Sequence, residues 1–176
     1  MEAERLIEAG RSALAGSRGV PAVMAEAWQA QALARAVGGQ LARCGPAELR
    51  TEARGLSETC ALGSAVLEHP LVPAAAVRAS QLTEVGHVPQ ALAALALLLG
   101  EAGIALVGVA CGTEEEGLYW QCIEAIDAVD ESVDRVHGML RRLAEQEHEH
   151  EQELDRERDG PFGVIHGPAG FVAGQP

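Results

Sequence analysis

The sequence predicts an all-α protein: an up-and-down bundle of four long helices, a short N-terminal helix and a flexible C-terminal tail. Apolar residues recur at gaps of three and four along nearly the whole chain, which is the spacing of one face of a helix. No stretch alternates apolar and polar residues over the length of a strand. Clusters of glycine and proline interrupt the helical pattern and mark where helices end and begin.

The first two helices are expected over residues 2–15 and 21–43. The inward side of the first consists of Leu6, Gly10 and Ala13, or of Ile7 and Leu14. Gly16 and Gly19 end it, and Pro21 suits the first turn of the second helix. The apolar stripe of the second helix is mostly alanine, which requires close packing: Val23, Ala27, Ala30, Ala34, Val37 and Leu41. Trp28 beside this stripe is expected to anchor the core or its edge.

A third helix is predicted from Pro46 to about His69 and Pro70, with the apolar series Leu49, Ala53, Leu56, Cys60, Gly63 and Leu67. A fourth is predicted from about Pro73 to His87. Pro89 removes one backbone donor, so it either kinks the chain there or splits the fourth piece from the next, at 90–111.

Residues 90–111 carry two apolar stripes. One is bulky: Leu92, Leu95, Leu99, Leu106 and Val109. The other is mostly small: Ala93, Ala96, Gly100, Gly103, Val107 and Ala110. A helix that is apolar on both sides is expected in the centre of a bundle, so leucine at position 100 or 103 should overpack the core.

The last helix follows a tight hairpin. Gly112 ends the preceding helix, and Thr113 with Glu116 fits a capping box. The apolar series of the last helix is Cys122, Ile126, Val129, Val133, Val136, Leu140 and Leu143. Packing is therefore expected to stop near residue 144.

Charge divides the chain into three parts. Residues 114–159 hold 16 of the 26 acids and 5 of the 13 arginines, which is −11 of the net charge of −13. The tail after them has no charged side chain. We expect a bundle domain at 1–144, an acidic helical extension or spacer at 145–159, and a disordered Gly/Pro apolar repeat tail at 160–176.

Composition limits the functional classes. The acidic balance disfavours binding to nucleic acid. The N-terminus lacks the basic start and apolar core of a secretory signal, and the four cysteines lack the spacing of a zinc site, so a cytoplasmic protein without cofactor is expected. A membrane span from Ala91 to Ala110 is the less favoured alternative, because Glu101 lies at its centre and no Lys or Arg flanks it.

One pattern resembles a metal-binding bundle. An acid followed three residues later by histidine lets one helix offer two ligands to a metal, and it occurs at Glu84 with His87 and at Asp134 with His137. The match is partial, because the second acid is Asp and Pro89 follows His87 closely. These four residues are weak metal-ligand candidates, because such pairs arise readily by chance in an acidic helical protein.

Two segments are candidates for binding a protein partner. Glu124, Asp127, Asp130, Glu131 and Asp134 form an acidic face on the last helix that could dock a basic partner. The tail repeats a GPxG unit and displays its apolar residues behind a charged spacer, as a docking peptide would: Phe162, Val164, Ile165, Phe171 and Val172.

Three stretches carry a resemblance: residues 25–33 (AEAWQAQAL), residues 48–56 (ELRTEARGL) and residues 103–127 (GIALVGVACGTEEEGLYWQCIEAID). They look like a family of small helical proteins of unknown function from high-GC actinobacteria. The resemblance covers about residues 1–144 and implies an all-α cytoplasmic protein. It implies no catalytic residue, substrate or cofactor.

No nucleophile and base pair, and no phosphate-binding loop, stands out in the sequence. The leading hypothesis is therefore a non-catalytic interaction or adaptor protein that binds a protein partner. It is also a possible homodimer, because an apolar stripe could be covered by a second copy. The alternative is a carboxylate and histidine bundle that binds a metal or ligand, as an enzyme could.

Overall fold

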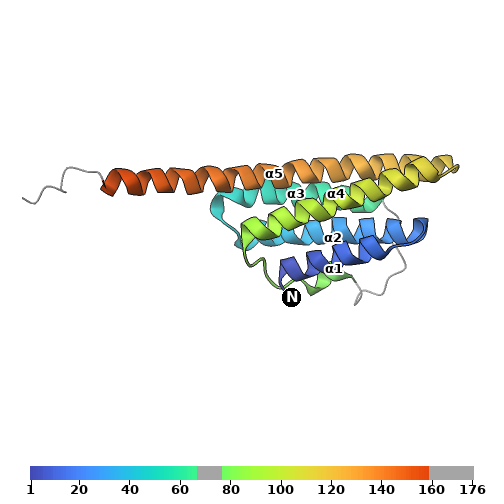
Figure 1. Cartoon of the computed structure of the whole chain (residues 1–176), viewed down its shortest axis with the longest axis horizontal. Coiled ribbons are helices and arrows are strands. Elements are labelled where there is room, and N and C mark those ends of the chain that lie inside the picture. The colour runs from blue at the N-terminus through green and yellow to red at the C-terminus, as the bar shows by residue number, and fades with distance from the viewer. Residues whose placement is uncertain (67–76, 159–176) are drawn as a thin grey trace, which may run out of the picture. The chain divides into compact units, whose positions relative to one another are not determined.

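The computed structural model describes residues 1–66 and 77–158, and it confirms the all-α prediction (Figure 1). The α-helices are α1 (Ala3–Gly16), α2 (Val20–Cys44), α3 (Arg50–Val66), α4 (Val88–Gly112) and α5 (Glu116–Arg158). Two short 3₁₀ helices, η1 (Ala47–Leu49) and η3 (Arg78–Gln81), precede α3 and α4. In the part of the chain that the structure describes there is no strand, only one bridge between Glu2 and Glu84.

The chain divides into two units, one of residues 1–143 and one that begins at Ala144. Helix α5 runs without interruption through this boundary to Arg158. The tail at 160–176, with its candidate docking residues, lies outside the described residues.

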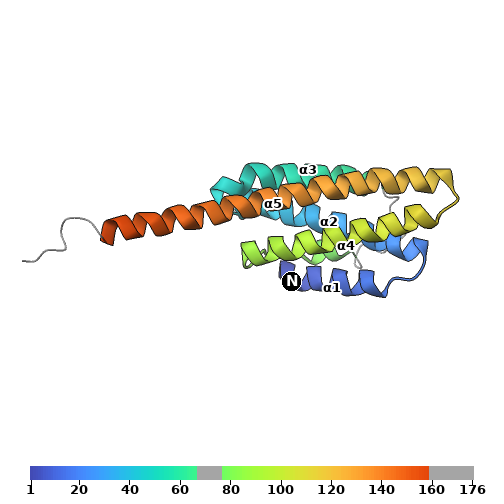
Figure 2. The same ribbon diagram turned by 45° about the horizontal axis from the view of Figure 1, so that its top comes forward.

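The interior of the first unit is built largely from alanine and leucine. Its fully buried large side chains are Leu6, Ile7, Leu33, Leu41, Leu49, Leu56, Leu92, Leu95, Leu98, Leu99 and Leu106. Trp28 is buried at the edge of this core, as expected from its place beside the alanine stripe of α2. Helix α2 packs against α1, α3 and α4, so it occupies the central position that the sequence assigned to residues 90–111 (Figure 2).

Glycines bring α2 and α3 into very close contact. A Cβ atom at Gly38 would lie 2.8 Å from the carbonyl oxygen of Ala53 and 3.0 Å from the backbone nitrogen of Ser57. Real Cβ atoms do not approach backbone this closely, so only glycine fits at position 38. Gly63 likewise lets α3 approach α5 closely, since a Cβ there would lie 2.9 Å from the Cβ of Ala128.

The expected helix from Pro73 to His87 is wrong for residues 77–87, which form η3 and an extended segment; residues 73–76 lie outside the described residues. The N-terminus takes the backbone hydrogen bonds that a helix would have used. The amide of Ala3 donates to the carbonyl of Glu84 at 3.1 Å, and the amide of Thr83 donates to the carbonyl of Met1 at 3.1 Å.

Of the two alternatives expected at Pro89, the kink does not occur and the chain is divided there, because α4 begins at Val88 with His87 as its N-cap. Proline in the first turn removes no helical hydrogen bond, since the first amides of a helix have no partner within it. The expected capping box at Thr113 is replaced by a turn in which the Thr113 hydroxyl accepts from the amide of Glu115, and α5 starts one residue later.

The burial of α4 differs from the expectation as well. Its bulky stripe is buried, but Ala93 and Val107 of the small stripe are exposed and Gly100 is half-buried. A Cβ at Gly100 would meet nothing within 4 Å, so leucine at position 100 has no core to overpack, whereas a Cβ at Gly103 would lie 3.3 Å from Val129. Helix α4 therefore packs against its neighbours on one side, and its outer face stays exposed.

Helix α5 turns its smaller residues inward. Its fully buried residues are Cys122, Ala125, Val129, Ser132, Val136 and Met139. The expected series contained Cys122, Val129 and Val136, but its bulkier members Ile126, Val133 and Leu140 are only half-buried. These three side chains lie at the edge of the core, where they can line a surface groove.

The paired glycines of α2 provide a test of the close helix contact. Gly38→Ala should lower the free energy of unfolding by about 1–3 kcal/mol, because its methyl group would press on the backbone of α3. Gly39→Ala should instead raise it by up to about 1 kcal/mol, since its methyl would meet the end of the Arg43 side chain and lie in ordinary contact with the Ser57 hydroxyl, and alanine favours a helix. Urea unfolding followed by circular dichroism measures both, and an equal response at the two positions would contradict the contact.

Candidate functional site

The four candidate metal ligands do not converge. Glu84, His87, Asp134 and His137 are all exposed. His87 lies at the start of α4, where its amide donates to the Glu4 carboxylate at 3.2 Å, and Asp134 and His137 lie on α5. Among the described residues, no group of three or more His, Cys, Asp or Glu side chains could hold a metal ion.

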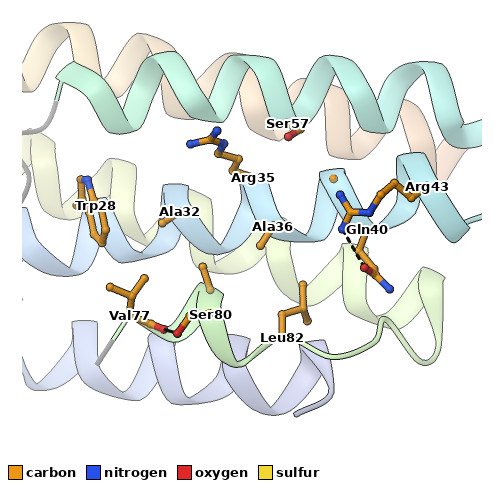
Figure 3. Close-up of a pocket in the computed structure, with 12 residues that line it drawn as sticks. Trp28, Ala32, Arg35, Ala36, Gln40, Arg43, Ser57, Val77, Ser80 and Leu82 are labelled. Carbon is orange, nitrogen blue, oxygen red and sulfur yellow. Dashed lines mark hydrogen bonds between the residues drawn. The ribbon is translucent and has the colours of Figure 1, made fainter. Parts of the chain in front are cut away.

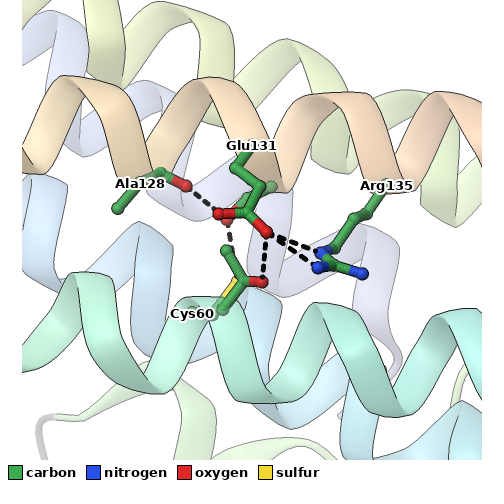
Figure 4. Close-up of polar contacts among 6 residues, drawn as sticks. Cys60, Ala128, Glu131 and Arg135 are labelled. Carbon is green, nitrogen blue, oxygen red and sulfur yellow. Dashed lines mark hydrogen bonds and ion pairs between the residues drawn. The ribbon is translucent and has the colours of Figure 1, made fainter.

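The polar contacts inside the bundle join α3 to α5 (Figure 4). The Ser132 hydroxyl donates to the carbonyl of Ala128 at 2.7 Å, which uses its only proton. The Cys60 thiol, 3.3 Å from the Ser132 oxygen, must therefore be the donor in that contact. Burial raises the pKa of Cys60 to about 11, so this thiol stays protonated and unreactive at neutral pH.

Beside this contact, Glu131 links the same two helices at the surface. Its Oε1 accepts from the Thr59 hydroxyl at 3.2 Å and from Arg135 Nη2 at 2.7 Å. The hydrogen bond from Arg135 is the main cause that lowers the pKa of Glu131, with a further contribution from Thr59. This arrangement holds α3 against α5 and leaves no polar group of it aimed at a cavity.

The acidic face of α5 is exposed as a whole: Glu124, Asp127, Asp130, Glu131 and Asp134. Asp127, Asp130 and Asp134 form no hydrogen bond or ion pair with another described residue. Their charges are therefore directed to solvent and could meet a basic surface.

The outer face of α4 is the largest departure from a sealed bundle. Leu97, Ile104 and Val107 are 56%, 75% and 46% exposed. With Ala93, Gly100 and Cys111 they form what we call the α4 stripe, in which the gaps alternate four, three, four, three and four. A sustained four-three spacing of apolar residues is the pattern of a helix that packs along another helix.

Grooves border the α4 stripe on both sides. On the α5 side, a groove of about 540 Å³ is lined by Leu97, Gly100, Ile104, Val133, His137 and Leu140, with Ala93, Ala96 and Glu101. On the α1 side, a groove of about 410 Å³ is lined by Leu14, Ala15, Ile104 and Ala105, with Glu8, Arg11, Ser12 and Glu101. Ile104 lines both grooves and therefore forms the ridge between them.

One charged residue lies on α4, and it is neutralised. Glu101 accepts hydrogen bonds from Arg11 of α1, at 3.0 Å from Nε and 2.6 Å from Nη2. The hydrogen bond from Arg11 lowers the pKa of Glu101, and partial desolvation opposes it. The α4 stripe thus carries no uncompensated charge in a protein with a net charge of −13.

The sequence analysis assigned Ala93, Gly100 and Val107 of the α4 stripe to the interior, and it placed Leu97, Ile104 and Cys111 in neither of its two series. Helix α4 is long and apolar enough to cross a membrane, and 44% of its most apolar stretch is buried inside the bundle. Hydropathy alone cannot distinguish a buried face from an exposed one. The distinguishing signal is the four-three series 93, 97, 100, 104, 107 and 111, which is separate from the series that packs on α2.

The chain matches one family over residues 1–142, the family of unknown function DUF6099. The match covers the first unit almost entirely and ends before the acidic extension. No curated protein and no solved structure matches the chain.

Thiol reactivity tests the assignment of Cys60. In native protein at mildly alkaline pH, iodoacetamide should modify the exposed Cys44 quickly and the buried Cys60 and Cys122 only after unfolding. Mass spectrometry of peptides against time gives the rates. Rapid native modification of Cys60 would contradict its burial and its raised pKa.

The ion pair between α1 and α4 should make stability depend on pH. Because folding lowers the pKa of Glu101, its stabilising contribution is present above the unfolded value of 4.5 and is lost as the pH falls through the folded value. Glu101→Gln should therefore be less stable than the wild type at neutral pH and equal to it in acid. Urea unfolding across this range measures the difference, which should also shrink as salt is added.

Proposed function

Since the chain belongs to this family of unknown function, we propose from its surfaces that it is a non-catalytic protein–protein interaction protein whose first partner is a second copy of itself. The observation that carries the proposal is the exposed, uncharged α4 stripe. Contiguous apolar patches of this kind are rare on monomers and mark contact surfaces.

The order of residues in the α4 stripe supports a second copy as the occupant. In an antiparallel pair related by a two-fold axis level with residue 102, each stripe residue faces a fixed stripe residue of the other copy. Gly100 faces Ile104, Leu97 faces Val107, and Ala93 faces Cys111. Every stripe residue has a stripe partner, as self-pairing requires.

The sizes of the facing residues are complementary at the centre. Ile104 is the most exposed of the large apolar side chains in the described residues, and Gly100 leaves an open notch with nothing within 4 Å of its missing Cβ. Because the axis lies between them, each copy offers one ridge and one notch. Two ridge-in-notch contacts form together, which a pairing shifted by one turn would lose.

Electrostatics favours the same arrangement. The acids that dominate the net charge lie in residues 114–159, and the only charge on α4 is paired with Arg11. The stripe is therefore a surface on which two acidic copies can meet without opposing charges. Antiparallel helices also place opposite ends of their dipoles side by side.

The size of the interface predicts moderate affinity. The stripe spans 19 residues, from Ala93 to Cys111, and is about 27 Å long. A stable dimer buries about 800 Å² from each copy. A single helix face supplies only part of that area, so residues along the two grooves must supply the rest, among them Leu14 on α1 and Leu140 on α5.

An adaptor needs a second surface, and the acidic face of α5 is the candidate. Asp127, Asp130 and Asp134 point to solvent without partners among the described residues. A basic protein surface is the complementary chemistry, and its association rate should fall as salt is added.

Self-association can be measured with one disruptive and one matched substitution. Ile104→Asp should weaken dimerisation at least tenfold in sedimentation equilibrium, because it buries a charge in the centre of the contact. Leu62→Asp is the control, since Leu62 is 72% exposed on α3 and should leave dimerisation unchanged. Both variants should unfold in urea as the wild type does.

A wild type that is monomeric at high micromolar concentration would overturn the dimer. So would equal dimerisation of Ile104→Asp and wild type. If the wild type sediments with phosphatidylcholine vesicles and Ile104→Asp does not, the α4 stripe binds a lipid surface and not a second copy.

Cross-linking tests the antiparallel register. In a Cys44→Ser background, Ala93→Cys should give a covalent dimer with a short bismaleimide, through a link between position 93 and Cys111 of the other copy. Cys44→Ser alone should give none, because two Cys111 thiols would be about 27 Å apart. A Cys111 to Cys111 link would instead indicate a parallel pair.

A further inference from the structure

A second cavity lies away from the α4 stripe, between α2, α3 and the segment that contains η3 (Figure 3). Its volume is about 570 Å³, which is the size of a small-molecule site. Its walls come from three parts of the chain: residues of α2 (Trp28, Ala32, Arg35, Ala36, Gly39, Gln40 and Arg43), Ser57 of α3, and Val77, Ala79, Ser80 and Leu82.

The lining has two arginines and no acid, in a chain where acids outnumber arginines 26 to 13. Arg35 forms no hydrogen bond or ion pair with another described residue. Arg43 is bound through Nη2 to the amide oxygen of Gln40 at 3.1 Å, a neutral partner that leaves its charge uncompensated. Both guanidinium groups are therefore available to an anion.

Gly39 creates the space in which an anion could meet these groups. The point that a Cβ of residue 39 would occupy is 3.3 Å from Arg43 Nη1 and 3.7 Å from the Ser57 hydroxyl oxygen. A guanidinium donor and a hydroxyl donor thus converge over bare backbone. One carboxylate or phosphate group is large enough to accept from both.

The other end of the cavity is apolar and held in place. Trp28, Ala32 and Val77 line it, and Figure 3 shows Trp28 at the opposite end of the cavity from Arg43. The segment that carries Val77 is fixed to α2 at Arg78, whose guanidinium pairs with Glu26 at 2.6 Å and whose amide donates to Gln29 at 3.0 Å. This wall therefore exists before any ligand arrives.

We propose that this cavity binds a small organic anion, with its carboxylate or phosphate at Arg43 and Ser57 and its apolar body directed towards Trp28, while Arg35 adds positive charge to the same cavity. The site is separate from the α4 stripe and does not depend on self-association. The polar end of the cavity binds the anionic head group of the ligand, and the apolar end binds its body, so a ligand needs both parts. An inorganic anion lacks the body, and an uncharged aromatic compound lacks the head.

Trp28 can report binding once the second tryptophan of the chain is removed. In a Trp120→Phe background, Trp28 fluorescence should change saturably with phenyl phosphate or phenylacetate, which distinguish the two head groups. Inorganic phosphate should bind at least tenfold more weakly than phenyl phosphate. Benzyl alcohol should cause no saturable change.

Variants connect the signal to the cavity. Arg43→Gln should weaken binding about tenfold, which is the loss of one charge-assisted contact. Arg35→Gln should weaken it less, because it removes positive charge from the cavity and no direct contact with the head group. Gly39→Ala should weaken it as strongly as Arg43→Gln while the fold remains stable, because the methyl fills the space at which the donors converge. Arg5→Gln on α1 is the matched control and should change nothing.

The proposal fails if neither phenyl phosphate nor phenylacetate gives a saturable signal at millimolar concentration. It also fails if both arginine variants bind as the background does, or if inorganic phosphate binds as tightly as phenyl phosphate. Isothermal titration calorimetry with the Arg35→Gln and Arg43→Gln pair confirms or contradicts the fluorescence result without relying on Trp28.

Discussion

The fold depends on how closely its helices can approach one another. Aromatic side chains are few, and glycine and alanine let the backbones meet closely, above all at Gly38 of α2 against the carbonyl of Ala53 in α3. Close packing around α2 seals one side of α4 and leaves the other side bare. The exposed stripe is thus a direct result of the small interior.

The same geometry separates three kinds of surface on the first unit. The α4 stripe is apolar and uncharged, α5 presents unpaired carboxylates, and the cavity along α2 presents two arginines. The three surfaces therefore differ in charge. No metal-binding cluster occurs among the described residues, so these surfaces are what the first unit offers to a partner or ligand.

Helix existence could be predicted from the sequence because glycine, proline and the four-three spacing are local signals. The bounds of α1 and α2 follow from Gly16, Gly19 and Pro21 in this way. The segment from 77 to 87 could not be predicted, since its hydrogen bonds go to Met1 and Ala3, which local patterns do not reveal. The inward position of Ser132 on α5 depends on Cys60 across the interface, and the close approach of Ala128 depends on Gly63, which are also non-local contacts.

The candidate sites show the same division. The acidic face of α5 is visible in the sequence because its residues are near neighbours on one helix. The apolar α4 residues were visible too, but whether a stripe faces inward depends on how many helices surround it. The arginine cavity had no sequence signal, because Arg35 and Arg43 line a cavity only when the fold brings Ser57 and Val77 beside them.

The links between α1 and α4 have a consequence for the order of folding during synthesis. Arg11 and Glu101 are 90 residues apart in the chain. The amide of Ala3 likewise donates to a residue that is made much later, Glu84. Helices α2 and α3 can pair as soon as both are made, since they are neighbours in sequence. Helix α1 is synthesised earlier, but its fixed polar contacts close only when α4 has emerged from the ribosome. Its apolar side must therefore be shielded by α2 or by a chaperone until translation has passed residue 101.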